Sequence, residues 1–256
     1  MVKALNYGRL GNSHWQNAVA IVYALRHGLE FTVPNTTNDS YWNPIYLQNL
    51  VNPNWNPNLP SVQLNEPHFH YAPIPFDESF RSMNVILNGY WQSWNFLSGY
   101  EKEIIELFNY PWHLEAGVCS IHARFSDYLS IQGKHILVDR PYLETAISII
   151  KREKNIHRFK VFSDDLRYFR ENFGSVYGFE YSTNTDIIED LVEISCCHSQ
   201  INSSSTFSWW SAFLNRNPDK MVITNSQWFQ EGWKDDHGVV DTSDVIPEEW
   251  VKISTI

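Results

Sequence analysis

From residue 117 onward the chain alternates short apolar runs with longer stretches of helical periodicity, and this alternation limits the possible folds more than any other feature. Each apolar run has the length of a strand, and each stretch that follows has apolar residues at helical spacing. Repeated strand-then-helix order predicts an α/β fold with a parallel sheet flanked by helices. The predicted strands lie at 117–122, 159–163, 177–181, 198–202 and 220–224, and the predicted helices at 141–152, 165–173, 186–196 and 206–215.

The first part of the chain has a different character. A turn rich in small residues at 8–12 leads into a predicted helix that Gly28 ends. Residues 34–80 then hold eight of the twelve prolines and many asparagines, which oppose long helices and central strands. We interpret 34–80 as a long ordered loop region. The change of pattern near residue 116 is the expected domain boundary.

Aromatic side chains are frequent in this loop region and in the chain as a whole. Aromatic residues make up 15% of the sequence, and their rings serve either as core or as platforms for sugars. The rings of Tyr41, Trp42 and Trp55 are therefore candidates for contact with a sugar acceptor. The competing interpretation is that they only fill the core.

Charge and cysteine usage exclude several classes of function. Nineteen basic and twenty-nine acidic residues give 19 − 29 = −10, which opposes broad binding to nucleic acid or to an anionic membrane surface. Three cysteines without paired spacing argue against a disulfide scaffold and favour a reducing compartment. The longest apolar run, 18–25, is too short to span a membrane. We therefore expect a soluble cytoplasmic protein without a transmembrane segment.

Ligands of parallel α/β sheets bind beyond the carboxyl ends of the strands, so the residues that follow each run are the candidates for function. His122, Arg124 and Asp127 follow the first run. A guanidinium at a strand end can hold a phosphate through two parallel bonds, and a carboxylate nearby can orient it or accept a proton. The alternative is a purely structural pair of Arg124 and Asp127.

Acidic residues follow two other predicted strands. Asp164 and Asp165 come after the second run, where one of them can cap the next helix and the other can meet a ribose hydroxyl or act as a base. Asp190 lies on a predicted helix, where a charge usually faces solvent. If that helix end faces a nucleotide, the carboxylate can accept two hydrogen bonds from guanine.

A serine-rich segment follows the fourth predicted strand. Its hydroxyls and backbone N–H groups stand at a helix start, where geometry and dipole favour a phosphate. The ordinary alternative is a helix N-cap with Trp209 and Trp210 in the core. The residues concerned are Ser204, Ser205, Thr206 and Phe207.

Metal binding is not supported by the spacing of possible ligands. Cys196, Cys197 and His198 are adjacent, and His68 with His70 has no second pair to complete a site. The sequence also lacks a GxxxxGK[ST] phosphate loop and a GxSxG elbow. We expect no metal ligands and no cofactor.

Six motifs in register carry a resemblance to a known family. They are GRLGN at 8–12 with Gln16, GYWQS at 89–93, HARFSD at 122–127, FSDD at 162–165, EDL at 189–191 and NSSSTFSWW at 202–210. In this order they resemble the α-1,2-fucosyltransferases of glycosyltransferase family 11. The resemblance extends to Trp228-Phe229 and the segment 246–250, and it covers nearly the whole chain except 34–80.

The resemblance implies an inverting enzyme that moves L-fucose from GDP-fucose to a hydroxyl of a galactose-containing glycan without a metal. It implies the GT-B arrangement, two Rossmann-like domains facing a cleft, with an acceptor-side domain at 1–116 and a GDP-sugar-binding domain at 117–256. Arg124 is then the catalytic cation on the β-phosphate, and Asp127 is the candidate base. The implied donor-binding residues are His122, Arg124, Asp164, Asp165, Asp190, Ser204, Ser205, Thr206, Phe207, Gly11 and Asn12.

This chain departs from the family pattern at two places. The usual HxRRGD has Phe125 in place of its second arginine and Ser126 in place of its glycine. The segment 13–15 reads Ser-His-Trp where the family usually has Gln-Met-Phe. Two alternatives to the fucosyltransferase interpretation therefore remain. One is a GDP-sugar transferase of another linkage, and the other is a non-catalytic glycan-binding module.

Overall fold

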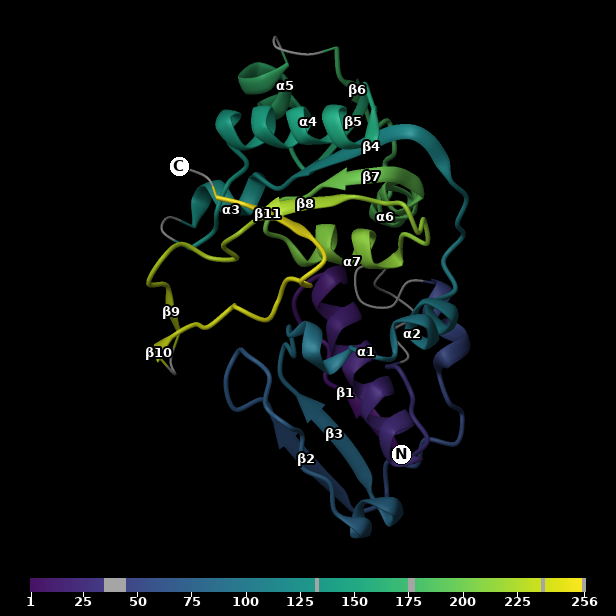
Figure 1. The fold of residues 1–256 in the computed structure, drawn as a ribbon. Helices are drawn as coiled ribbons and strands as arrows, with labels where there is room; N and C mark the ends of the chain where they lie inside the picture. Colours follow the sequence, from purple (N-terminus) through teal and green to yellow (C-terminus); the bar gives the residue numbers. More distant parts are fainter. Residues whose placement is uncertain (35–44, 132–133, 175–177, 236–237, 255–256) are drawn as a thin grey trace. The chain divides into compact units, whose positions relative to one another are not determined.

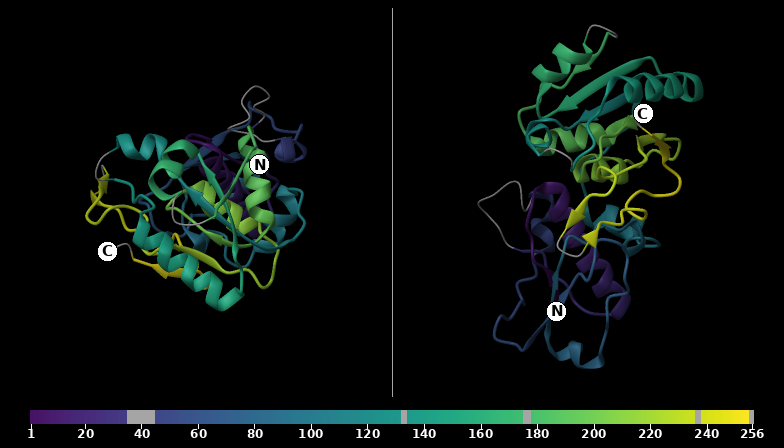
Figure 2. Two further views of the ribbon diagram at one scale, coloured as in Figure 1. Left: turned by 90° about the horizontal axis from the view of Figure 1, so that it is seen from above. Right: turned by 90° about the vertical axis from the view of Figure 1, so that its left-hand side faces the viewer.

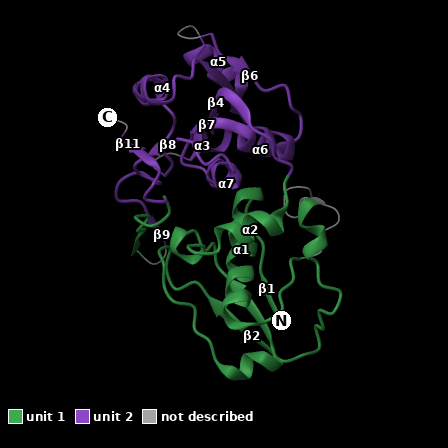
Figure 3. Ribbon diagram, turned by 45° about the vertical axis from the view of Figure 1, so that its right-hand side comes forward, with its two compact units in different colours: residues 1–110, 236–246 green, residues 111–235, 247–256 purple. Residues whose placement is uncertain are grey.

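The computed structural model describes residues 1–34, 45–131, 134–174, 178–235 and 238–254, so Tyr41 and Trp42 lie outside the described residues. The chain forms two compact units (Figure 3). Unit 1 comprises residues 1–110 and 236–246, and unit 2 comprises residues 111–235 and 247–256. The division into an acceptor side before residue 116 and a donor side after it remains a prediction.

Unit 2 contains a six-stranded sheet in which every neighbouring pair is parallel, in the order β11-β8-β7-β4-β5-β6 (Figure 1). Strand β4, the first strand of this sheet along the chain, lies near its centre, and the sheet grows outward from it in both directions, as in doubly wound folds. The predicted α/β class with a parallel sheet flanked by helices is thus confirmed. The strands are β4 (Glu115–Ala123), β5 (Arg158–Ser163), β6 (Glu180–Tyr181), β7 (Cys197–Ile201), β8 (Val222–Asn225) and β11 (Val251–Ile253), with a short separate β9 (Lys234–Asp235).

Helices cover both faces of this sheet. Helices α4 and α5 lie on one face, and α6 and α7 lie on the other (Figures 1 and 2). The first face is closed by a core in which Ile121 and Val161 of the sheet pack with Ile147 and Phe169 of the helices. The bounds are α3 (Ser126–Ser130), α4 (Arg140–Lys154), α5 (Leu166–Phe173), α6 (Ile187–Cys196) and α7 (Thr206–Leu214).

Unit 1 has a smaller parallel sheet in the order β1-β3-β2. The long helix after β1 is nearly all buried along its first fifteen residues and ends at Gly28, whose φ of 62° is the left-handed conformation that suits glycine. The predicted helix stop is therefore confirmed. The elements are β1 (Val2–Ala4), α1 (Leu10–His27), η1 (Ile45–Leu50), β2 (Ser61–Asn65), η2 (Glu78–Ser82), β3 (Asn84–Asn88), η3 (Trp94–Phe96), α2 (Glu101–Phe108) and β10 (Gly238–Val239), where η marks a 3-10 helix.

The interpretation of 34–80 as a loop region is wrong for residues 61–65. These residues form β2, which pairs with β3 over five positions at the edge of the sheet. The prolines permit this because Pro60 precedes the strand and Pro67 follows it, so no ladder N–H is missing. The segment also contains η1 and part of η2. Across the described residues, no helix is long and apolar enough to cross a membrane.

Candidate donor site at the carboxyl edge of the unit 2 sheet

The order of the strands in unit 2 creates a place where the connections that follow two neighbouring strands lead to opposite faces of the sheet. Strands β4 and β7 are neighbours, yet α4, which follows β4 and α3, covers one face while α7, after β7, covers the other. At such a switch point the two connecting loops separate and leave a crevice at the carboxyl ends of the strands. The loops that border it are 124–125 after β4 and 202–205 after β7. These are two of the segments that the sequence singled out.

Arg124 stands at this point with its guanidinium held by two carboxylates. Its Nε donates to Oδ1 of Asp127 at 2.8 Å, and its Nη2 lies 2.7 Å from the same oxygen. Its Nη1 lies 3.0 Å from Oδ2 of Asp164. The side chain is only 13% exposed, and its Cζ lies 5.8 Å from the centre of the Tyr128 ring. The structure thus brings together Arg124, Asp127 and Asp164.

The Asp164 carboxylate is held by three hydrogen bonds and one ion pair within the protein. Its Oδ1 accepts the backbone N–H of Phe125 at 2.8 Å, and its Oδ2 accepts the backbone N–H of Ser126 at 3.2 Å. The hydroxyl of Ser126 also bonds to Oδ2. With Arg124, four groups from the turn after β4 converge on this carboxylate, which fixes the shape of the turn.

His122, the next-to-last residue of β4, spans the switch point. Its Nδ1 is hydrogen-bonded to the hydroxyls of Ser203, at 3.0 Å, and of Ser208. The ring lies 5.0 Å from the ring of Phe207. Burial lowers the pKa of His122 to about 4, against a smaller opposing effect of Asp164, so the imidazole is neutral at pH 7. A neutral ring at this place can offer a hydrogen bond without adding charge.

The serine-rich loop after β7 is ordered by its own polar groups. The carbonyl of Ser204 accepts the Tyr128 hydroxyl at 3.2 Å, and the Ser204 hydroxyl donates to the carbonyl of Gln227 at 2.9 Å. Ser205 is the N-cap of α7 and accepts the N–H of Phe207 at 3.3 Å. Thr206 and Phe207 form the first turn of that helix. The helix-cap interpretation is therefore confirmed, and the phosphate-binding role remains a prediction.

The other two predicted donor-binding acids of unit 2 are engaged within the protein. Asp165 is the N-cap of α5 and accepts the N–H of Tyr168 at 2.8 Å. Asp190, in the first turn of α6, accepts the hydroxyl of Ser182 at 2.7 Å and the amide of Asn184 at 3.1 Å, both through Oδ1. Burial raises the pKa of Asp190, and these two hydrogen bonds partly offset the effect. Its role as reader of guanine remains a prediction.

The departure at Phe125 leaves the surroundings of Arg124 intact. Phe125 is 1% exposed and packs on the rings of Tyr168, Phe169 and Phe173 in the core beneath α5. Arg124, one residue earlier, faces the carboxylates instead. Position 125 is thus a core position in this chain, and an aromatic ring there suits its neighbours.

Gly11 and Asn12 belong to unit 1, where both lie in the first turn of α1 rather than in the predicted turn. The side-chain Oδ1 of Asn12 accepts the side-chain amide of Gln92 at 2.9 Å, which ties the GRLGN motif to the GYWQS motif. Glu66 after β2 accepts the N–H groups of Tyr90, at 2.7 Å, and Trp91, at 2.8 Å. Trp91 has a φ of 56°, so these bonds hold a strained turn.

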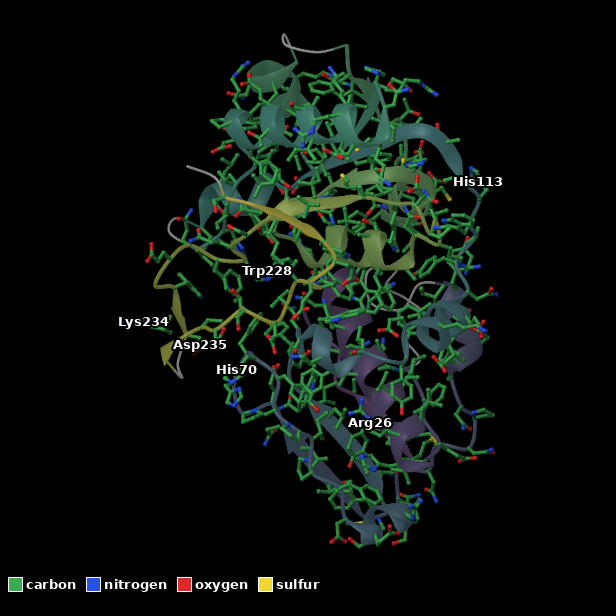
Figure 4. The ribbon with its side chains drawn as sticks, in the orientation of Figure 1. Arg26, His70, His113, Trp228, Lys234 and Asp235 are labelled. Atoms are coloured by element: carbon green, nitrogen blue, oxygen red, sulfur yellow. The ribbon has the colours of Figure 1, made fainter. Side chains whose placement is uncertain are left out.

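The remaining candidates have ordinary surroundings. Trp55 has the ammonium of Lys3 over its ring at 4.2 Å, so one face is already covered. Cys196 Sγ accepts the backbone N–H of His113, on the segment that leads into β4 (Figure 4), at 3.4 Å. Trp228, from the closing motif of the family, is 4% exposed and serves as core after β8 (Figure 4). Among the residues with described positions, no three His, Cys, Asp or Glu side chains group to hold a metal ion.

Sequence reasoning missed Tyr128 and Ser208, which touch the site. Tyr128 lies between Arg124 and the Ser204 carbonyl and stacks on His135 with ring centres 3.6 Å apart. Burial raises the pKa of Tyr128 to about 12, so its hydroxyl keeps its proton. Ser208 was inside a quoted motif, but helical spacing alone does not tell which serine of α7 faces β4.

Comparison with known proteins gives an independent result. The family model described as "Glycosyl transferase family 11" matches residues 8–254. "O-antigen biosynthesis glycosyltransferase WbnK" of Escherichia coli is 31% identical over 142 residues, covering 53% of this chain and 44% of that protein. "Alpha-1,2-colitosyltransferase" of Escherichia coli is 25% identical over 187 residues, covering 64% and 61%. "Galactoside alpha-(1,2)-fucosyltransferase 2" of Oryctolagus cuniculus is 23% identical over 238 residues, covering 81% and 65%.

The matched regions amount to less than two thirds of the length of each of these three relatives. Among solved structures, a crystal structure of POFUT1 in complex with GDP aligns with a TM-score of 0.35 and 11% identity, over 57% of this chain and 55% of that one.

Proposed function

Since this chain belongs to glycosyl transferase family 11, we propose that it transfers L-fucose from GDP-fucose to a hydroxyl of a galactose-containing glycan, with inversion and in α-1,2 linkage. The family assignment confirms the resemblance carried by the six motifs. The names of two relatives, an alpha-1,2-colitosyltransferase and a galactoside alpha-(1,2)-fucosyltransferase, support the linkage. The first of these names also makes colitose the second candidate for the transferred sugar.

The observation that carries the proposal is the position of Arg124 at the switch point of the unit 2 sheet. Departure of GDP places negative charge on the β-phosphate, and a fixed guanidinium stabilises that charge most when it is already in place. Arg124 is in place before any ligand arrives, because Asp164 and Asp127 hold it. We assign the pyrophosphate to Arg124 and to the N–H groups at the start of α7.

This assignment makes a metal ion unnecessary for the transfer. In metal-dependent transferases a divalent cation offsets the diphosphate charge, and here we assign that role to Arg124 and the α7 N–H groups. The absence of a cofactor is part of the same proposal. A chelator should leave the transfer rate unchanged. If a chelator abolished transfer and Mn²⁺ or Mg²⁺ restored it, the proposal that transfer needs no metal ion would be wrong.

Asp127 is proposed as the base that takes the proton from the acceptor hydroxyl. It is 37% exposed, so an acceptor can reach it from solvent, whereas Asp164 is covered by its four partners. A base must come within hydrogen-bond distance of the proton that it removes. The exposure supports Asp127 over its neighbour.

For the whole protein we propose the GT-B arrangement, with unit 2 binding the donor and unit 1 contributing the acceptor side. The polar edge of the unit 1 sheet, with Tyr7, Glu66 and Tyr90, supports the second half of this assignment. A cytoplasmic location is part of the proposal, since all three cysteines are free. We expect no nucleic-acid partner.

The deciding experiment is incubation of the protein with GDP-fucose or GDP-colitose and a panel of galactosides, followed by linkage analysis of the product. An α-1,2-linked fucosyl galactoside is the expected result. Transfer of colitose alone would select the second candidate. Glycan binding without turnover of either donor would favour a non-catalytic binding module.

A further inference from the structure

Arg124 carries one positive charge, but two carboxylates share it. The three groups together have a net charge of −1, at the place where a diphosphate is proposed to bind. A diphosphate placed beside this triad meets repulsion from whichever carboxylate remains close to it. The two carboxylates differ sharply in how firmly they are held.

Asp164 cannot leave Arg124 without dismantling the turn. It follows β5 and accepts the N–H groups of Phe125 and Ser126 and the hydroxyl of Ser126 as well as Nη1 of Arg124. Its side chain is 19% exposed. Removing it would leave the N–H of the buried residue Phe125 without its acceptor and would release the two donors of Ser126 at the surface.

Asp127 is bound in a way that a phosphate can copy. A single oxygen of Asp127 faces both Nε and Nη2 of Arg124, at 2.8 Å and 2.7 Å. These two N–H groups form the edge of the guanidinium that best matches phosphate or carboxylate oxygens. Asp127 lies in the short helix α3 and is 37% exposed, so it can turn away toward water.

We propose that Asp127 occupies on Arg124, in the ligand-free protein, the position that an oxygen of the donor diphosphate takes, and that the donor displaces it while Asp164 keeps Arg124 in place. The inference rests on the proposed function. It makes Asp164 a positioning residue that acts on the donor through Arg124. It also gives Asp127 its second role, because the displaced carboxylate gains a free lone pair for the acceptor proton.

The two carboxylates should therefore act in opposite directions on the binding of GDP. Asp127→Asn removes the competing charge and should tighten GDP binding, by roughly two- to fivefold for a partly exposed charge. Asp164→Asn lets the guanidinium move and should weaken GDP binding by about tenfold or more. Asp139→Asn is the matched control, since Asp139 caps α4 and asparagine caps a helix as aspartate does, and it should leave GDP affinity unchanged.

The experiment is calorimetric titration of the full chain and the three variants with GDP, and with inorganic pyrophosphate as a probe that lacks the base. Both probes should follow the same order of affinity. Steady-state transfer kinetics of the same proteins distinguish this role from a merely structural one. Asp127→Asn should bind GDP more tightly than the unaltered chain and yet transfer sugar more slowly. Asp127→Ala repeats the displacement test, which does not depend on whether Asp164→Asn folds.

Each outcome separates this inference from the proposed function. If the unaltered chain binds GDP but a folded Asp127→Asn binds it equally or less tightly, displacement is wrong and the proposed function stands. If Asp164→Asn folds and binds GDP normally, the positioning role is wrong. If the unaltered chain binds neither GDP nor pyrophosphate, both proposals fall.

Discussion

The imidazole Nδ1 of His122, near the end of β4, is hydrogen-bonded to the hydroxyl of Ser208 in the first turn of α7. The two residues are 86 positions apart in the chain and come from opposite sides of the switch point. Ser203 shares the same nitrogen. These hydroxyls hold the ring in its orientation and affect the balance between its two tautomers, and they leave Nε2 as the nitrogen available to a ligand.

Ser208→Ala should therefore change the ring of His122 without changing its charge. We expect a loss of about 1 kcal/mol of unfolding free energy from the missing hydrogen bond. Nitrogen NMR of the His122 ring should show a changed mixture of tautomers. The control is Ser211→Ala, because Ser211 is equally buried in α7 but donates to the Ser208 carbonyl. An unchanged tautomer in Ser208→Ala would contradict the orienting role.

Arg124 should be the residue whose loss is most damaging to transfer. Arg124→Lys keeps the charge but loses the planar pair of donors, so it should reduce the transfer rate more than the affinity for GDP. Arg124→Ala should reduce both, with a loss of rate of roughly 100-fold or more, as for one preorganised oxyanion donor. Transfer kinetics and GDP titration of each folded variant test this. Near-normal transfer by Arg124→Ala would remove the basis of the proposed site.

Gly8 should tolerate no side chain. Its φ is 85°, and a Cβ there would collide with the side chain of Asn12, which binds Gln92. Gly8→Ala should cost about 1–3 kcal/mol through backbone strain, measured by denaturant unfolding. Gly178→Ala is the control, since no other described residue comes within 4 Å of a Cβ at that position. Equal stability of the two variants would show that the turn before α1 relaxes freely.

The stability of the protein should fall between about pH 6.5 and pH 4. Burial lowers the pKa of His14 and of His122 from 6.5 to about 4. Below pH 6.5 the unfolded chain therefore takes up protons that the folded chain does not, and the free energy of unfolding decreases until about pH 4. Each histidine contributes at most about 1.4 kcal/mol per pH unit in this window.

Denaturant unfolding at a series of pH values checks this expectation. His14→Gln should flatten the decline, because glutamine does not titrate. The exposed His157 offers the control, and His157→Gln should leave the slope as it was. A stability that stays constant from pH 7 to pH 4.5 would mean that the buried rings take up protons in the folded protein.

Much of unit 2 could be predicted from the sequence because strands such as β4 and β8 are mostly buried and appear as short apolar runs. Each of the five predicted runs overlaps a strand. The strand β11 was not predicted, since three residues, Val251–Ile253, carry no periodicity of their own and are recognisable only beside β8. The strand β2 was hidden by the prolines on either side of it, although its alternation of polar and apolar residues is typical of an edge strand.

The sequence was enough to predict which strand ends carry the site residues, but not most of the contacts between those residues. Arg124 and Asp127 were identified as a pair, and their contact is confirmed. The partners of Asp164 were not identified, because its four donors belong to a turn about forty residues earlier in the chain. Two of these donors are backbone N–H groups. Backbone donors have no signature in a sequence. The same limit applies to Glu66, which binds two N–H groups of the turn after β3.

The path of the chain also bears on how such a protein can be recombined. Residues 236–246 belong to unit 1 and residues 247–256 to unit 2, so the chain passes from one unit to the other three times. The late segment is anchored in unit 1, where the Asp244 carboxylate accepts the N–H of Tyr71 and the hydroxyl of Ser93. A chimera made by one crossover near residue 110 would therefore inherit this anchor from the wrong parent. Exchange of either unit between relatives needs two further breakpoints, at 235 and 246, and single-crossover libraries of this family should yield few folded members.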